Sequence, residues 1–463
     1  MPDPQFPFPF FPVEFTKDGK PFQPDETDKL LAALKDSKPP TDLFVMSHGW
    51  NNNLEEAKQL YAGLAGQVAK QISGQPSLAG RSFAICGILW PSKKFEEKDL
   101  IPSGAASLSD SVTEEDLKSR IDDLSDLLQA KGWPMEEDDA ELESKIEELK
   151  ESAEDWEFDP AVRTSAVKAI RSILDKGAAS PNDADASEKF FALRPEILIT
   201  NLSKSLNPPA RVPQGTPAAS VDPFSTGGGG GVGGAAGLRD VLGGIKGSFL
   251  HLLNYSTYYL MKSRAGDVGT KGVAPLLKKI RDTAPEVRLH LIGHSFGCRV
   301  VTTAVSALPD DPKYRPNTMT LLQAAFSHNG FASHWDDQHD GAFRHVVTGK
   351  KVRGPILITH TRNDKAVGIA YPIASRIAGQ AAASLGDEHD IFGGLGSNGA
   401  QSTPERVVGT LLETGGKYPF SSGASSSIPY NLKADSFISG HSDIVNPQVA
   451  WAVSVALQSP DAV

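Results

Sequence analysis

The chain has 463 residues, more than the roughly 100 to 200 residues of a typical domain, so we expect an enlarged domain or a core with a substantial insertion. Its 57 acidic residues outnumber its 46 Lys and Arg residues, and the net charge of -11 argues against nucleic acid or an anionic membrane surface as a partner. Only two cysteines occur, Cys86 and Cys298, and neither has a metal-site partner at short spacing. We therefore predict neither a disulfide framework nor a metal site.

The chain begins MPDPQFPFPFFPVEF, in which prolines interrupt the aromatic residues. This segment lacks the basic and continuous apolar parts of a secretory signal peptide, so we expect a cytoplasmic protein. The stretch nearest to a membrane span, residues 238–261, contains Arg239, Asp240 and Lys246. We interpret it as a partly buried helix or an amphipathic lid and predict no stable membrane span.

Strands and helices alternate in the first 90 residues. The turn Asp18-Gly19 between short apolar stretches predicts an edge hairpin. Apolar runs predict buried strands at residues 43–46 and 82–90, and a helix-compatible stretch lies between them at residues 53–72. This order is typical of a βαβ unit.

The alternation is lost between residues 91 and 262, where we predict a mainly helical insertion. Residues 111–114 (SVTE) match a capping box, and the acidic helices that follow carry a solvated face. Residues 226–237 are nearly all glycine or small residues without a following Gly-Lys-Ser/Thr, so they predict a flexible loop rather than a phosphate loop. Because the insertion leaves the carboxyl end of a strand, we expect a cap or lid beside a ligand site. In an alternative interpretation the insertion is regulatory and the glycine tract is its hinge.

The alternation returns after residue 262. A helix at residues 273–282 precedes an apolar strand, a tight turn and a second helix within residues 287–308. Further strands are predicted in the segments TMTLLQAAF, GPILITHT and ADSFI, with helix-compatible segments at residues 370–383 and 447–456. The pattern indicates an α/β fold, with a parallel sheet between two layers of helices. Residues 1–90 and 263–463 would form this core.

The tight turn reads Gly293-His294-Ser295-Phe296-Gly297, a Gly-x-Ser-x-Gly pattern. Between an apolar strand and a helix, this pattern is typical of a nucleophile elbow, where small flanking residues permit a strained turn that presents the serine hydroxyl. The alternative is an ordinary strand-to-helix turn.

A nucleophilic serine needs a general base, and the base needs an orienting carboxylate. Asp364 and His441 each follow a predicted strand, so we predict Ser295 as nucleophile, His441 as base and Asp364 as the acid. We expect His389 at the surface, because no predicted strand precedes it. An alternative acid lies among three aspartates after an earlier strand: Asp336, Asp337 and Asp340.

His48-Gly49-Trp50 follows the first buried strand. We predict that the backbone N–H groups of Trp50 and Phe296 form an oxyanion hole, in which one lost donor costs about 10² to 10³ in rate. We expect the His48 side chain to brace the loop rather than transfer protons. The alternative is a strand-end turn with a core tryptophan.

These motifs resemble those of the α/β-hydrolase superfamily, in particular hydrolase-like proteins whose first motif reads HGWNN. The resemblance covers residues 41–90 and 265–460 and rests on four motifs: HGWNN (48–52), GHSFG (293–297), NDKAV (363–367) and GHSDI (440–444). It implies an α/β-hydrolase fold with a mostly parallel sheet of about eight strands and hydrolysis of carboxylic esters or related acyl bonds through an acyl-enzyme, without a cofactor. The long insertion, placed before the elbow, departs from the family pattern and leaves the substrate open.

Amide or thioester hydrolysis and acyl transfer would use the same residues, and a non-catalytic binding protein of the same fold is a further alternative. A single HGX motif resembles lipases for longer acyl chains, and residues 249–261 could line a hydrophobic pocket or, alternatively, pack the insertion onto the core. The expected partner is a small acyl ester. Because His441 must be neutral to act as a base, activity should fall on acidification through its pKa.

Overall fold

The computed structural model describes most of the chain. The described residues are 4–50, 52–92, 112–130, 133, 139–174, 179–203, 235–379, 389–421 and 425–459. The glycine tract predicted to be a flexible loop, residues 226–237, lies outside these ranges except for its last three residues, which begin a helix.

Eight strands of the described chain form one all-parallel sheet in the order β1-β3-β2-β4-β5-β6-β8-β7. The strands are β1 (Phe10–Glu14), β2 (Asp42–Ser47), β3 (Phe83–Leu89), β4 (Arg288–His294), β5 (Thr318–Leu322), β6 (Ile356–His360), β7 (Val407–Thr410) and β8 (Pro429–Lys433). Parallel neighbours require crossover connections, which are mostly helical here. The predicted α/β fold, with a parallel sheet of about eight strands flanked by helices, is confirmed.

The helices fall into two groups. Those packed with the sheet or connecting its strands are α1 (Pro24–Ala33), α2 (Leu54–Ser73), α10 (Ala274–Thr283), α11 (Phe296–Ala307), α12 (Arg344–Thr348), α13 (Lys365–Ile377), α14 (Leu395–Asn398) and α15 (Pro447–Ala456). Those between β3 and β4 are α4 (Glu114–Leu128), α5 (Ala140–Glu151), α6 (Pro160–Ser172), α7 (Ser187–Ala192), α8 (Pro195–Leu202) and α9 (Ala235–Asp267).

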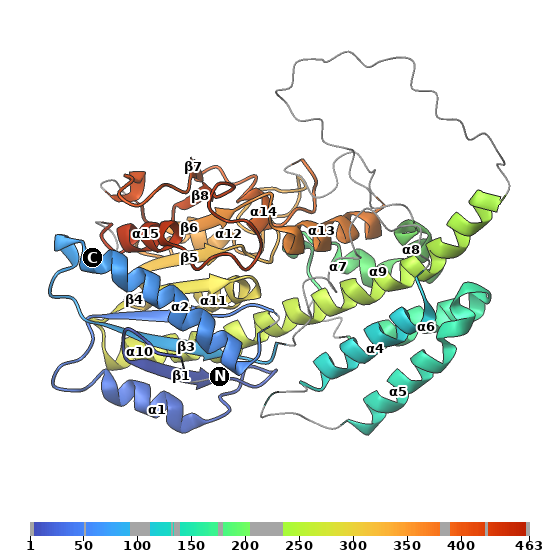
Figure 1. Cartoon of the computed structure of the whole chain (residues 1–463), viewed down its shortest axis with the longest axis horizontal. Coiled ribbons are helices and arrows are strands. Elements are labelled where there is room, and N and C mark those ends of the chain that lie inside the picture. Colours follow the sequence, from blue (N-terminus) through green and yellow to red (C-terminus); the bar gives the residue numbers. More distant parts are fainter. Residues whose placement is uncertain are drawn as a thin grey trace, which may run out of the picture.

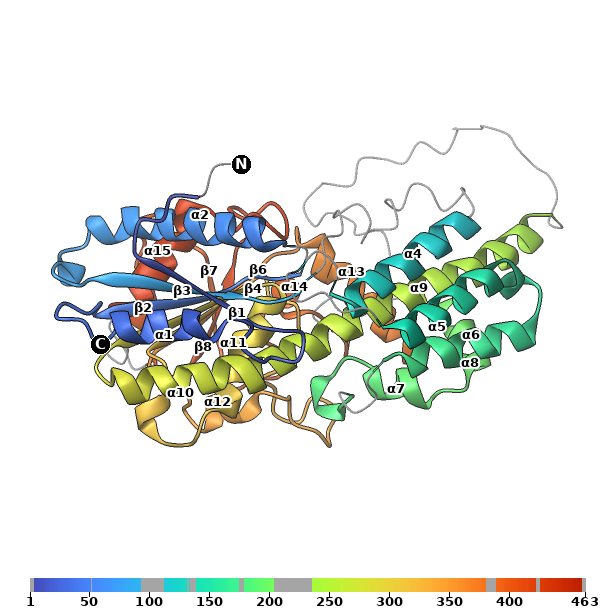
Figure 2. The ribbon, with the colours of Figure 1, turned by 90° about the horizontal axis from the view of Figure 1, so that it is seen from below.

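Alternate residues of each strand face opposite sides of the sheet. Leu43 and Val45 of β2 belong to a hydrophobic cluster that includes residues of α10 and α11, whereas Phe44 and Met46 belong to a second cluster with residues of α2 and α15. Figure 2 shows α2 and α15 on one side of the sheet and α1, α10 and α11 on the other. Burial on both faces explains why β2 and β3 are nearly continuous apolar runs.

Two predicted strand features differ in the structure. The turn at Asp18-Gly19 closes only one antiparallel bridge, Phe15 to Pro21, and β1 instead pairs in parallel with β3. The segment ADSFI forms a turn after β8, because the Ile438 N–H bonds the Ala434 carbonyl at 2.9 Å and both side chains are buried.

The capping box of α4 lies two residues beyond the predicted start. Thr113 Oγ1 accepts from Asp116 N, and the Asp116 carboxylate accepts from Thr113 N. Ser111, the predicted first residue of the box, lies outside the described residues.

The helices between β3 and β4 lie beyond the carboxyl ends of the strands (Figures 1 and 2). Long α9 joins them to the sheet: buried Arg264 donates to the carbonyls of Pro91, just past β3, and Leu127, in the last turn of α4. The expected insertion boundary between residues 262 and 263 falls inside α9, which continues through a π-helical turn (Val268–Val273) into α10. The division of the chain at residues 91 and 262 stays a prediction.

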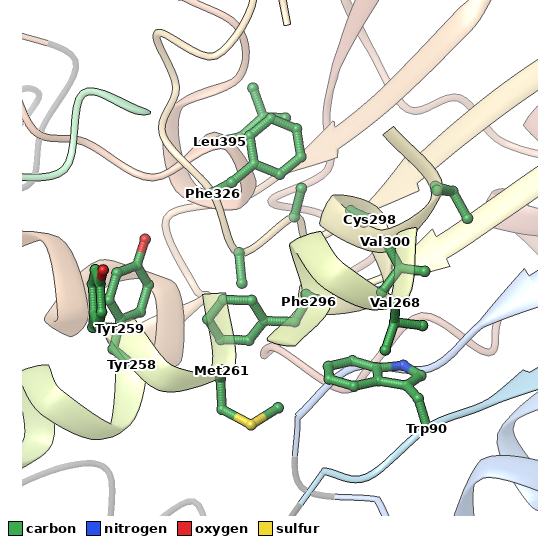
Figure 3. Packing of buried hydrophobic residues seen from close by; sticks show 14 of the residues in the cluster. Trp90, Tyr258, Tyr259, Met261, Val268, Phe296, Cys298, Val300, Phe326 and Leu395 are labelled. Carbon is green, nitrogen blue, oxygen red and sulfur yellow. The ribbon is translucent and has the colours of Figure 1, made fainter. Parts of the chain in front are cut away.

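The apolar side of α9 packs against α11. The Tyr258 ring lies 5.5 Å from the Phe296 ring, and its hydroxyl bonds that of Tyr371 at 2.9 Å. Figure 3 shows Tyr258, Met261 and Val268 grouped around Phe296, with Val300 of α11 nearby. Residues 249–261 thus include many members of the buried core, which favours the packing interpretation over the pocket.

Candidate active site

Ser295 lies on a strained turn between β4 and α11. Its φ of 55° is a left-handed value that non-glycine residues adopt at a cost of about 1–3 kcal/mol. A Cβ on Gly293 would lie 2.5 Å from Cys298 N, and one on Gly297 would lie 2.1 Å from the Ser47 carbonyl oxygen. Ser295 occupies the N-cap position of α11, yet its side chain does not cap the helix. The turn therefore needs both glycines and leaves the hydroxyl out of the helix.

The loop after β2 lies directly against this serine. A Cβ on Gly49 would lie 2.9 Å from Ser295 Oγ and 2.3 Å from Ser295 Cβ, so only glycine fits there. The Trp50 ring contacts the Phe296 ring edge-on at 6.0 Å. Phe296 is the first residue of α11, where backbone N–H groups have no acceptor within the helix. The loop that carries Trp50 and the start of α11 thus meet at Ser295.

The His48 side chain is buried beneath this loop. Its ring stacks near Trp90 and Trp133, with centroids 5.5 and 5.8 Å away. Nδ1 lies 2.9 Å from the Gly49 carbonyl and therefore donates, which leaves Nε2 to accept from Trp90 N at 3.3 Å. Burial lowers the pKa of His48 to about 4. A neutral, enclosed histidine of this kind fits the expected role as a brace.

Asp364 and His441 meet at the carboxyl ends of β6 and β8. His441 Nδ1 lies 2.8 Å from Asp364 Oδ2, and the Asp364 side chain is buried while that of His441 is 12 % exposed. Asp364 caps α13 by accepting from Val367 N at 3.0 Å, and its Oδ2 also accepts from Gln323 Nε2 at 3.0 Å. Burial raises the pKa of Asp364, but His441 and the other donors outweigh it and hold the pKa below its ordinary value. The carboxylate is therefore an acceptor, and His441 Nδ1 is the donor.

His294 links the His441 loop to the elbow. Its Nε2 donates to the His441 carbonyl oxygen at 2.9 Å, and the two rings are 5.0 Å apart. Burial, and secondarily the His441 ring, lower the pKa of His294 to about 3, so this side chain is neutral. Since His294 immediately precedes Ser295, the hydrogen bond holds the His441 backbone beside the predicted nucleophile.

The alternative acids lie in a separate hydrogen-bonded loop. Asp336 pairs with the His339 ring at 2.8 Å, and Asp340 lies 3.7 Å from the His334 ring. Asp337 and Asp340 are exposed, as is His389. The carboxylate that the structure places on His441 is Asp364. Two site contacts were not predicted, the Gln323 amide on Asp364 and the Trp133 ring beside His48, because no local motif marks either residue.

Among the described residues, no group of three or more His, Cys, Asp or Glu side chains could hold a metal ion. In the same part of the chain, no helix has the length and apolar character needed to cross a membrane. Comparisons of the chain with models of protein families, with curated proteins and with solved structures found no match.

Proposed function

We propose that this protein is a serine hydrolase with the α/β-hydrolase fold and that it cleaves carboxylic esters through Ser295, His441 and Asp364. The observation that carries the proposal is the bond of 2.8 Å between buried Asp364 and His441, whose loop is tied to the residue before a strained serine. The three residues follow β4, β6 and β8 in the chain order Ser, Asp, His, which is the order of this fold.

In the proposed reaction, the neutral His441 donates Nδ1–H to Asp364 and uses Nε2 as the base. Nε2 takes the Ser295 proton as Oγ bonds to the acyl carbon, and the backbone N–H groups of Trp50 and Phe296 stabilise the oxyanion. His441 then gives this proton to the leaving alkoxide as the ester C–O bond breaks. Water repeats the cycle on the acyl-serine and releases the acid.

We further propose that the helices between β3 and β4 act as a cap. Support comes from their position beyond the carboxyl ends of the strands and from the contact of Tyr258 with Phe296. Tyr258→Ala should then change the ratio of activities on butyryl and decanoyl p-nitrophenyl esters. If the folded variant keeps the wild-type ratio, the cap does not contribute to substrate selection.

The decisive experiment is labelling by a fluorophosphonate probe, which reacts with activated serines. Wild-type protein should be labelled at Ser295, and both Ser295→Ala and His441→Ala should abolish labelling. Ser256→Ala and His345→Ala are matched controls, because Ser256 bonds a carbonyl inside α9 and His345 contacts Ser306 at the surface. Equal labelling of folded Ser295→Ala protein would contradict the proposal.

A further inference from the structure

Gln323 is the first residue after β5, and its side chain reaches the Asp364 carboxylate. Its Nε2 lies 3.0 Å from Asp364 Oδ2 and 3.1 Å from the Gly396 carbonyl oxygen. Both partners are acceptors, so the amide nitrogen must face them and the amide oxygen must point away. The Oδ2 atom that Gln323 binds is the same one that accepts from His441 Nδ1.

Gln323 has two features that cost stability. Its φ of 48° lies in the left-handed region, which is unfavourable for a non-glycine residue. Its Oε1 is buried without a hydrogen-bond partner among the described residues, so the desolvation of this oxygen is not compensated. Costs of this kind are concentrated at functional sites, where the surrounding structure holds a residue in an unfavourable state.

The surroundings hold Gln323 in this conformation from two sides. Its backbone N–H donates to Thr359 Oγ1 of β6 at 3.2 Å. A Cβ on Gly396 would lie 2.6 Å from the Gln323 carbonyl carbon, so the turn that carries Gly396 packs directly on this backbone. The side chain is fully buried, and its direction toward Asp364 is therefore fixed by packing as well as by hydrogen bonds.

We propose that Gln323 is a positioning residue that fixes the plane of the Asp364 carboxylate and directs Oδ2 at His441. Val367 N holds Oδ1 and Gln323 Nε2 holds Oδ2, so the carboxylate cannot rotate away from the imidazole. Both donors also stabilise the ionised carboxylate, which keeps the proton on His441 when the imidazolium forms. The inference rests on the proposed hydrolase function.

Two variants of the full-length chain test this role. Gln323→Met keeps the length of the side chain but removes the donor, and we expect the second-order rate of fluorophosphonate labelling at Ser295 to fall about 10- to 100-fold, the loss of one hydrogen bond to a charged group. Gln323→Glu places a second carboxyl beside Asp364. This carboxyl faces two acceptors, Asp364 Oδ2 and the Gly396 carbonyl oxygen, so it is held protonated and donates in place of the amide, and we expect it to retain most of the wild-type labelling rate.

The matched control is Gln129→Met, which removes another buried amide, at the C-terminus of α4, whose nitrogen and oxygen have no hydrogen-bond partner in the described part of the chain. We expect its labelling rate and pH profile to equal those of wild type. A second readout is the low-field proton resonance of the His441 Nδ1–H···Asp364 bond, identified by its loss in His441→Gln. It should shift or broaden in Gln323→Met but not in Gln129→Met.

The outcomes separate the two proposals. If wild type is labelled and folded Gln323→Met keeps its rate, pH profile and resonance, the positioning role is wrong while the hydrolase proposal stands. If wild type is not labelled but its resonance changes in Gln323→Met alone, the hydrolase proposal fails and Gln323 still orders the Asp364–His441 pair. If wild type does not react with the probe and Gln323→Met also leaves the resonance unchanged, the positioning role is wrong as well.

Discussion

Two aspartate–histidine pairs, each with a buried aspartate, lie at opposite ends of the sheet. Near the amino ends of the strands, Asp42 of β2 bonds His290 Nε2 of β4 at 2.9 Å. Beyond the carboxyl ends, Asp364 bonds His441 Nδ1 at 2.8 Å. Residue types, bond lengths and burial of the aspartate are nearly the same, so the pair itself does not determine a function.

The surroundings of the two histidines differ. His290 lies within a strand, is fully buried, and has Thr318 Oγ1 on its other nitrogen at 2.9 Å, while Asp42 also binds Arg81 and Thr41. His441 lies in a loop, is partly exposed, and is tied through His294 to the residue before Ser295. We therefore assign the enclosed pair to the stability of the fold and propose that the pair near Ser295 transfers a proton.

The largest expected effect is on activity and comes from the second pair. Asp364→Asn removes the acceptor that selects the His441 tautomer, and the rate of ester hydrolysis should fall about 10⁴-fold. The free energy of unfolding should change much less than the activation free energy of the reaction, because the asparagine can still cap α13. The measurement is p-nitrophenyl butyrate hydrolysis alongside urea unfolding. A folded variant that keeps its rate would make this pair structural, like the first.

The opposite result is expected at the first pair. Asp42→Asn leaves Arg81 and His290 without their carboxylate, and breaking such a buried pair costs about 3–5 kcal/mol of unfolding free energy. The rate per folded molecule at neutral pH should stay at the wild-type value. Urea unfolding and the same ester assay measure the two quantities, and a large loss of rate with unchanged stability would reverse our assignment.

The ionisation of Asp42 also makes the free energy of unfolding depend on pH in the acidic range. Burial raises its pKa, but the hydrogen bonds from Arg81 and His290 outweigh this and lower the pKa well below the ordinary value. A lowered pKa in the folded state gives stability that is present above the unfolded pKa of about 3.9 and is lost as the pH falls through the folded value. The stability gap between wild type and Asp42→Asn should therefore narrow below about pH 4.

Neutral buried histidines occur at both ends of the sheet and predict a separate pH dependence. Burial lowers the pKa of His48 to about 4, and it also lowers that of His290. The unfolded chain takes up these protons near pH 6.5 and the folded chain does not, so stability is full above about pH 6.5 and falls on acidification. His48 contributes about 1.4 kcal/mol per pH unit between about pH 6.5 and 4, and His290 adds a loss of the same sign.

Unfolding by urea between pH 7.5 and 4.5 measures the slope of the unfolding free energy against pH. In His48→Gln the slope below pH 6 should be smaller than in wild type by about 1.4 kcal/mol per pH unit, whatever the change in stability at pH 7.5. The control variant is His345→Gln, which removes an exposed histidine and is measured over the same pH range. An equal slope in His48→Gln would mean that His48 is protonated in the folded chain.

The contrast between the two pairs also shows what could be predicted from sequence. Apolar runs followed by small or polar residues mark strand ends, and this pattern predicted β2, β3, β4, β5 and β6 and located Asp364 just past β6, whereas the strand predicted directly before His441 is a turn. Their catalytic roles stay a prediction. The pattern failed at β8, because PYNLK mixes polar and apolar residues while the adjacent ADSFI resembles a strand more closely.

Contacts between distant residues could not be predicted. Gln323 lies 41 positions from Asp364, and Asp42 lies 248 positions from His290. Each contact depends on which strands become neighbours, and the order β2-β4-β5-β6 is a property of the assembled sheet. A glutamine after one strand and a histidine within another carry no local signal of their partners.

The smallest expected effect comes from Thr318, whose side chain supports the first pair as Gln323 supports the second. Thr318→Val keeps the shape of Thr318 but removes the hydroxyl that donates to His290 Nδ1, leaving a buried acceptor unpaired. We expect a loss of about 1–3 kcal/mol in unfolding free energy and no change in ester hydrolysis, in contrast to the rate loss proposed for Gln323→Met. Thermal and urea unfolding with the ester assay measure both. If Thr318→Val also slowed hydrolysis, the two ends of the sheet would be coupled, and the amino-end pair could no longer be assigned to stability alone.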